Sequence, residues 1–218
     1  MEAMNKEIYA LGVGHNTPVF IDLAEACGYK VVGLYHYEAG RTGESDHGIP
    51  ILGTFKDLFD KKDLTGMNFI LTMGDSRIRA EISDTILSYG GEVPTMIHPM
   101  SVISRFAQIS PVGVYISPFA YIQADTVIGS NTVILSHVNI SHSNIIGKNC
   151  FIAGASSIGA YTTVEDDVFI GQGVTSISGK VSRIGKGAFI GAGSLLTKDV
   201  DANVVMAGSP AKVIKQRT

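Results

Sequence analysis

A glycine-rich turn near the start of the chain holds the first residues that could bind a ligand. Gly12-Val13-Gly14-His15 follows an apolar run and precedes a predicted helix. Because the N–H groups at the start of a helix attract anions, this turn could bind a phosphate, and His15 is a candidate substrate contact. The signal is weak, since tight packing of a strand against a helix favours the same residues.

Polar residues also follow the next two long strands that we predict. His36, Tyr37 and Glu38 come directly after one strand, and α/β sheets bind ligands at the carboxyl ends of their strands. Asp75 and Arg79 follow the other strand, where Asp75 could contact a substrate or form the turn at the start of a helix. His36, Tyr37 and Asp75 are therefore further candidate substrate-binding residues.

Alternating strands and helices must position these residues. One predicted helix has Thr17 as its N-cap and Pro18 in its first turn, and a later one has Ser76 as its cap. The strands are predicted at Ile8–Val13, Lys30–Tyr35, Ile49–Leu52, Asn68–Met73 and Val93–Ile97. This alternation indicates a Rossmann-like domain over residues 1–95, built as a small parallel sheet of βαβ units.

The second half of the chain repeats with a period of six residues. Ten successive first positions of the repeat are aliphatic, and nine of them are isoleucine: Ile116, Ile122, Ile128, Ile134, Ile140, Ile146, Ile152, Ile158, Val164 and Ile170. A period of six drifts around a helix of about 3.6 residues per turn, and no hairpin turn interrupts the ladder. Neither an amphipathic helix nor an antiparallel sandwich therefore fits.

A parallel β-helix explains this period. One short strand and one corner use six residues, and three such units close a triangular coil of about 18 residues. The aliphatic residue points inward and stacks on its counterpart in the next coil, roughly 4.8 Å away. Small residues at the second position relieve crowding at the corners. The ladder therefore predicts a solenoid within residues 96–218.

Charge is divided unevenly between the two halves. Residues 1–95 hold 14 acidic and 8 basic residues, whereas residues 96–218 hold 6 and 9. With a net charge of −3, 45% apolar and 17% charged residues, the composition excludes a disordered chain and gives no electrostatic basis for binding nucleic acid. Two cysteines make neither a disulfide framework nor a metal cluster. The sequence has no membrane-span or signal-peptide pattern, so we expect a soluble, cytoplasmic protein without membrane insertion or metal.

The hexads resemble those of the hexapeptide-repeat acyltransferases, whose β-helix is left-handed. The ending Met206-Ala207-Gly208-Ser209-Pro210-Ala211-Lys212-Val213 is similar to the Gly-x-Pro-Ala-Lys close of that superfamily. The Gly-x-Gly-His turn, Met73-Gly74-Asp75-Ser76 with Arg79, and Ile97-His98-Pro99 resemble the bacterial sugar O-/N-acyltransferase family. That family includes nucleotide-linked 4-amino-sugar N-acetyltransferases and the sialic acid O-acetyltransferase group, and the resemblance covers nearly the whole chain.

The resemblance implies a function for each half. Residues 96–218 would form a left-handed β-helix acyltransferase domain with a C-terminal extension, and residues 1–95 would help to bind a nucleotide-sugar acceptor. His142 takes the position of the family's general base, a role that suits an imidazole because it titrates near neutral pH. General base catalysis typically contributes about 10²–10⁴-fold to a rate.

The resemblance also implies acetyl-CoA as the acyl donor and a homotrimer with CoA in the cleft between neighbouring subunits. The family lays the pantetheine arm against coil residues that correspond here to Phe151, Gly159, Ala160, Gln172 and Ala192. Small residues permit that close approach, although they also permit coil corners. The basic residues near the end of the chain suit the phosphates of CoA, although they could equally form a solvated surface.

Four departures from the family pattern concern the acceptor and the base. The acidic residue that follows the family's histidine is Ser143 here, an asparagine seven residues before it is Leu135, and a second histidine is Phe151. An acidic pair after the second strand is replaced by the segment 36–38. The fold and the acyl-CoA chemistry tolerate these changes, whereas the identity of the acceptor stays open.

These observations lead to one expected function and two alternatives. We expect acetyl transfer from acetyl-CoA to the amine of a nucleotide-linked amino sugar, a precursor of surface polysaccharide. O-acetylation of a sugar hydroxyl is one alternative, but a hydroxyl needs a stronger base than an amine, and Ser143 weakens that base. The other is a non-catalytic sugar-nucleotide-binding scaffold, in which Leu135, Ser143 and Phe151 mark lost activity.

Overall fold

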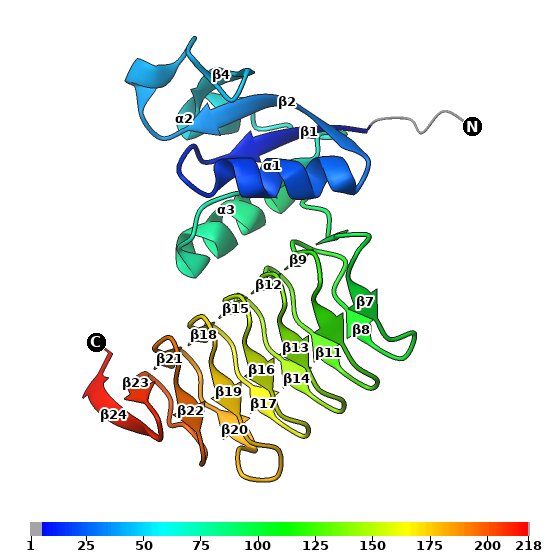
Figure 1. Cartoon of the computed structure of the whole chain (residues 1–218). Coiled ribbons are helices and arrows are strands. Elements are labelled where there is room, and N and C mark those ends of the chain that lie inside the picture. Colours follow the sequence, from blue (N-terminus) through cyan, green and yellow to red (C-terminus); the bar gives the residue numbers. More distant parts are fainter. Residues whose placement is uncertain (1–5, 218) are drawn as a thin grey trace. The chain divides into compact units, whose positions relative to one another are not determined.

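Two units of different architecture make up the chain (Figure 1). A computed structural model describes residues 6–217. One unit ends at Met96 and the other begins at Ile97. Within the described residues, no helix has both the length and the apolar character needed to cross a membrane.

The first unit is a five-stranded sheet with helices between its strands. Its strand order is β3-β4-β2-β1-β5. The strands are β1 (Lys6–Leu11), β2 (Tyr29–His36), β3 (Ser45–Asp46), β4 (Ile49–Thr54) and β5 (Phe69–Leu71). The helices are α1 (Thr17–Ala26), the short 3₁₀ helix η1 (Ala39–Arg41), α2 (Phe55–Phe59) and α3 (Ser76–Ser88). All pairings are parallel except that of β3 with β4, an antiparallel hairpin that the sequence pattern did not predict.

The arrangement of this sheet creates a natural ligand site. β1 lies between β2 and β5. After β1 the chain forms β2 on one side of it, and later it forms β5 on the other side. Ligands of α/β sheets bind at such switch points, outside the carboxyl ends of the strands. The residues that follow β1, β2 and β5 are those at Gly12–His15, at Tyr37 and at Met73–Gly74.

The starts of two helices differ from the prediction. Asn16 occupies the N-cap position of α1 without a side-chain cap bond, and Thr17 instead accepts a hydrogen bond from the N–H of Gly14 at 2.8 Å. Asp75, not Ser76, caps α3, because its carboxylate accepts the N–H groups of Arg77 and Ile78. In both cases a neighbouring residue was predicted as the cap.

The segment Val93–Ile97 also differs from the prediction. It was expected to add a strand to the small sheet, but its strand β6 (Met96–Ile97) belongs to a sheet of the solenoid. A short apolar strand gives the same sequence pattern in either sheet, so the pattern could not assign it.

The second unit is a left-handed parallel β-helix with three sheets. Its strands have two residues each, apart from the last two strands of the chain, which are longer and pair antiparallel. The first sheet contains β6, β9 (Tyr115–Ile116), β12 (Val133–Ile134), β15 (Phe151–Ile152), β18 (Phe169–Ile170), β21 (Phe189–Ile190), β23 (Val204–Gly208) and β24 (Ala211–Gln216). The second contains β7 (Val102–Ile103), β10 (Tyr121–Ile122), β13 (Asn139–Ile140), β16 (Ser157–Ile158), β19 (Thr175–Ser176) and β22 (Leu195–Leu196). The third contains β8 (Gln108–Ile109), β11 (Val127–Ile128), β14 (Ile145–Ile146), β17 (Thr163–Val164) and β20 (Arg183–Ile184).

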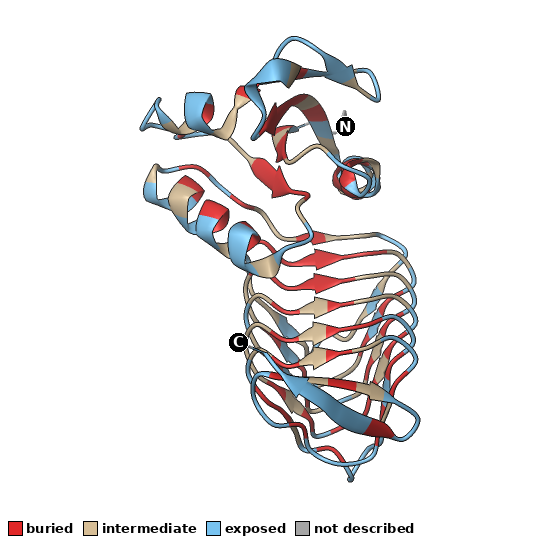
Figure 2. Ribbon diagram, turned by 90° about the vertical axis from the view of Figure 1, so that its left-hand side faces the viewer, coloured by how far each residue is buried: buried red, intermediate tan, exposed pale blue. Residues whose placement is uncertain are grey.

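The aliphatic ladder fills the interior of this solenoid, which confirms the predicted fold. Every ladder position from Ile116 to Ile170 is at most 1% exposed. Ladder residues pair in register between coils, as Ile122 does with Ile140. Figure 2 shows buried residues recurring from strand to strand in the solenoid sheet that faces the viewer. The small residues have a packing reason as well, since a Cβ on Gly159 would lie 2.5 Å from the backbone nitrogen of Ser178.

Candidate functional site

His142 lies in a groove on the surface of the β-helix. It follows β13 by two residues, its side chain is exposed, and the groove has a volume of about 600 Å³. All residues of this His142 groove belong to the second unit: Val102, Ser104, Tyr121, Gln123, Ala124, Asp125, His142, Ser143 and Tyr161. The side chain predicted as general base is therefore open to a substrate.

Two neighbours contact the imidazole of His142. Its Nδ1 lies 3.2 Å from the Ser143 hydroxyl oxygen, and its ring meets that of Tyr161 edge to face at a centroid distance of 5.1 Å. A hydroxyl can accept the Nδ1 proton, which leaves the Nε2 lone pair free to act as a base. Ser143 is thus a neutral hydrogen-bond partner of His142, whereas an acidic residue at this position would be a charged one.

The corner that carries His142 repeats in three successive coils. We define the His142 corner as residues 123–126, 141–144 and 159–162, which follow β10, β13 and β16. Asp125, Ser143 and Tyr161 occupy the same place in each coil and are all left-handed, with φ of 58°, 57° and 60°. Sequence reasoning missed Asp125 and Tyr161 as members of the site. Their spacing of one full coil on either side of Ser143 is the signal that could have identified them.

The residues predicted to bind the donor fall into two groups. Gln172 and Ala192 follow β18 and β21, at a corner that we call the Gln172 corner (residues 153–156, 171–174 and 191–194). Phe151 lies on β15, just before this corner, and its ring stacks on Phe169 at 5.5 Å, which in turn stacks on Phe189 at 4.5 Å. One chain therefore presents these three predicted residues at a different corner from His142.

Gly159 and Ala160 belong to the His142 corner. Their backbone N–H groups donate to the hydroxyls of Ser176 and Ser178, at 2.8 and 2.9 Å. Both residues are buried. Their small size thus serves the stacking of the coils, and contact with a pantetheine arm remains a prediction.

The basic residues near the end of the chain are partly engaged within the chain. Arg183 lies 3.5 Å from a Glu165 oxygen, and Lys186 lies 3.6 Å from an Asp167 oxygen. The Arg217 guanidinium donates to the Gly187 carbonyl and lies 5.9 Å from the Phe189 ring centroid. Arg183 and Lys186 therefore have acidic partners of their own.

Cys150 can be separated from the chemistry of the site. Its side chain is buried in the interior of the solenoid. Burial raises the pKa of its thiol to about 12. Since the thiolate is the nucleophilic form, this cysteine packs the core and does not act as a nucleophile.

A second cavity, of about 530 Å³, lies at the switch point of the first unit. We call it the turn pocket, and its lining is Gly12, Val13, Gly14, His15, Asn16, Tyr37, Phe55, Thr72, Met73, Gly74, Ile78 and Ile82. It brings together two of the four predicted substrate-binding residues, His15 and Tyr37. Apolar and aromatic side chains dominate it, as is usual for a small-molecule site.

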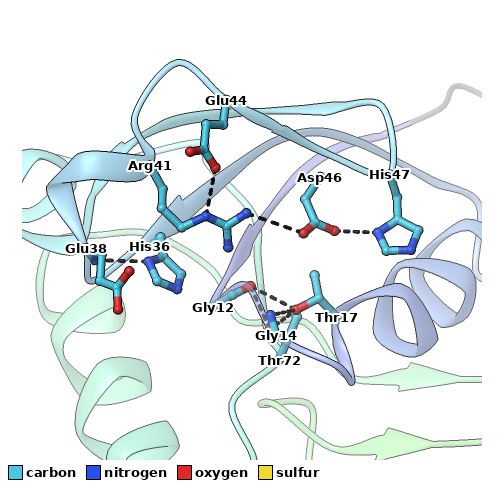
Figure 3. Close-up of polar contacts among 10 residues, drawn as sticks. All are labelled: Gly12, Gly14, Thr17, His36, Glu38, Arg41, Glu44, Asp46, His47 and Thr72. Atoms are coloured by element: carbon cyan, nitrogen blue, oxygen red, sulfur yellow. Dashed lines mark hydrogen bonds and ion pairs between the residues drawn. The ribbon is translucent and has the colours of Figure 1, made fainter.

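Two threonines hold the glycine turn of this pocket (Figure 3). The hydroxyls of Thr17 and Thr72 donate to the Gly12 carbonyl at 3.2 and 2.9 Å. Gly12 has a φ of +102°, and a Cβ there would lie 2.7 Å from the Thr72 hydroxyl oxygen. The turn therefore requires glycine at this position.

His36 and Asp75 do not line the turn pocket. His36 is 3% exposed, its Nδ1 accepts the Glu38 N–H at 3.0 Å, and its ring lies 4.2 Å from the ring of Tyr37. A hydrogen bond to Glu38 raises the pKa of Tyr37. The structure thus places His36 behind Tyr37 and uses the Asp75 carboxylate as a helix cap.

Comparison with known proteins identifies relatives over most of the chain. The chain is 32% identical over 181 residues to a GDP-perosamine N-acetyltransferase of Escherichia coli O157:H7. This alignment spans 80% of this chain and 79% of the relative. A crystal structure of PerB from Caulobacter crescentus, in complex with CoA and GDP-perosamine, matches 96% of this chain and 97% of its own, with a TM-score of 0.86 and 26% identity.

A third protein shares the fold. The acetyltransferase domain of PglB from Neisseria gonorrhoeae, in complex with acetyl coenzyme A, matches 96% of this chain and all of its own with a TM-score of 0.74 and 24% identity. No protein-family model matches the chain. The repeat, the two-unit fold and the relative aligned along four fifths of the chain agree with one another. The chain is an acyltransferase and belongs to the hexapeptide-repeat sugar acyltransferase family that includes GDP-perosamine N-acetyltransferase.

Proposed function

We propose that this protein transfers the acetyl group of acetyl-CoA to the amine of a nucleotide-linked amino sugar. The observation that carries the proposal is the long alignment with a GDP-perosamine N-acetyltransferase, in a chain whose His142 lies in an open groove. GDP-perosamine is therefore the first acceptor to test. The product would be a building block for a surface polysaccharide, made in the cytoplasm.

His142 would act as the general base of a direct transfer. The ammonium group of the sugar loses one proton to water, and the neutral amine then attacks the thioester carbonyl carbon, which forms a C–N bond. Nε2 of His142 takes the second proton from the nitrogen as the C–S bond breaks. The same proton then passes to the sulfur, so CoA leaves as a thiol and the imidazole is restored.

The turn pocket would bind the nucleotide part of the acceptor. Tyr37 and Phe55 offer aromatic surface to a base, and His15 lies in the turn before α1, where backbone N–H groups favour a phosphate. His36 supports the Tyr37 ring, so it would act on the nucleotide indirectly. Asp75 would act by fixing the start of α3, whose Ile78 lines the pocket.

The arrangement of the two corners supports a homotrimer. Phe151, Gln172 and Ala192 are predicted donor contacts, yet in one chain they belong to a different corner from His142. A second copy that presents its Gln172 corner to the His142 corner would complete the site. Acetyl-CoA would then lie between subunits, with Gly159 and Ala160 beside its reactive end.

An acceptor panel tests this function. The purified protein is given acetyl-CoA with GDP-perosamine, with UDP- and dTDP-linked amino sugars, and with the corresponding hydroxyl sugars, while release of free CoA is followed. We expect release with an amino-sugar nucleotide only. Release with hydroxyl sugars alone would establish O-acetylation instead, and tight nucleotide-sugar binding without any release would establish a non-catalytic binding protein.

A further inference from the structure

We propose that Asp125 selects an amine over a hydroxyl as the acceptor group in the His142 groove. The inference rests on the proposed function and deepens it, because it assigns the choice between N- and O-transfer to one side chain. Asp125 is exposed and lines the groove together with His142. Its carboxylate would hold the acceptor nitrogen while that nitrogen carries positive charge.

The charge of the groove supports this role. Asp125 is the one carboxylate among the residues that line it, and no lysine or arginine is among them. Within residues 6–217, the ion pairs of the structure leave Asp125 without a basic partner. A cation that enters this groove therefore meets a negative charge that is not already neutralised.

The position of Asp125 within the fold brings this charge close to the base. Ser143, the residue after His142, occupies the same corner position one coil further along. Its N–H donates to the carbonyl of Ala124, which precedes Asp125, at 2.9 Å. Stacked coils are about 4.8 Å apart, so the Asp125 position lies one coil from Ser143, the residue that follows His142 and contacts its ring.

The chemistry of the transfer explains why a carboxylate would favour an amine. An attacking amine nitrogen becomes positively charged as its bond to the carbonyl carbon forms, and it keeps that charge until His142 takes its proton. A fixed negative charge aimed at this nitrogen therefore stabilises the transition state more than the ground state. A hydroxyl loses its proton to the base as it attacks, so its oxygen gathers less positive charge and gains less from Asp125.

The variant Asp125→Asn tests the proposal, with Asp167→Asn as its control. Asparagine tolerates the left-handed backbone, so the coil should fold normally. Asp167 has the same backbone conformation, with φ of 62°, and does not line the groove. With GDP-perosamine and acetyl-CoA, we expect Asp125→Asn to lower kcat/KM about tenfold or more, and Asp167→Asn to leave it within about twofold.

Inhibition of the wild-type protein gives a second measurement that requires no variant. GDP-perosamine analogues with a trimethylammonium group or a hydroxyl in place of the amine are compared as inhibitors at low and high salt. We expect the cationic analogue to bind more tightly, and its binding to weaken with salt more than that of the hydroxyl analogue.

Two results would overturn the inference alone: unchanged kcat/KM in Asp125→Asn, or equal binding of both analogues to an active wild-type enzyme. If the wild-type protein is instead inactive with every amino-sugar nucleotide, the proposed function is overturned, and this inference with it.

Discussion

At the scale of single residues, the proposed base His142 has a neutral partner. Ser143 contacts Nδ1 of His142, where a carboxylate would stabilise the imidazolium ion more strongly. An amine is a better nucleophile than a hydroxyl and needs less help from a base. The neutral partner is therefore consistent with transfer to nitrogen.

The variant Ser143→Asp should strengthen the base. A carboxylate beside the imidazole favours its protonated form, so the acid limb of the pH–rate profile should move to higher pH, by up to about one unit. Aspartate tolerates the left-handed backbone of residue 143, whose φ is 57°. The profile of kcat against pH measures the shift, and Ser143→Ala controls for loss of the hydroxyl. An acid limb that stays in place or moves to lower pH would show that residue 143 does not tune His142.

The sequence indicated part of the candidate site at this scale. The resemblance singled out His142, and the glycine turn singled out His15, which the turn pocket includes. Asp125 and Tyr161 could not be found in the same way, because they meet His142 only after the coil is closed. The role of Asp75 at a helix start was weighed, but its capping of α3 appears only when its hydrogen bonds are known.

At the scale of elements, the ladder positions the site by stacking coils in a fixed register. The inward residues of β13 and β14, Ile140 and Ile146, are fully buried, whereas Ile145 beside them is 54% exposed. A side chain at one corner is therefore held at a set distance from its equivalents in neighbouring coils. This regularity is why the hexad period predicted the fold, while the two-residue strand β3, which has no period, was missed.

Paired substitutions in β14 test the ladder. Ile146→Ala should lower the free energy of unfolding by about 2–5 kcal/mol, because it leaves a cavity in a closely packed interior. Ile145→Ala removes the same atoms from the outer face of the same strand and should cost much less. Urea unfolding of both variants measures the difference. Equal losses would contradict the inward orientation of residue 146.

At the scale of the whole molecule, two units of opposite charge balance each contain a cavity. The acidic half carries the turn pocket, and the slightly basic half carries the His142 groove and the predicted donor residues. The division was predicted because composition and periodicity change together along the chain. The assembly was implied only by resemblance. In one chain, three of the five predicted donor contacts, Phe151, Gln172 and Ala192, lie at a different corner from His142.

Mixing two inactive variants tests the proposed trimer. His142→Asn removes the base, and Ala192→Trp adds bulk at the exposed Gln172 corner, where the donor is expected. If each site combines the His142 corner of one subunit with the Gln172 corner of another, mixed assemblies contain some intact sites. We expect activity to return when the two proteins are unfolded and refolded together. Failure to recover activity in proven mixed trimers would contradict a shared site.

The most direct test of the central claim is product analysis with wild-type and His142→Asn protein. Each is incubated with acetyl-CoA and GDP-perosamine, and the nucleotide sugar is examined by mass spectrometry while CoA binding is measured separately. We predict an N-acetylated product from the wild type, at least about 10²-fold slower formation by His142→Asn, and unchanged CoA binding. Near-normal product formation by a correctly folded His142→Asn variant would contradict the account.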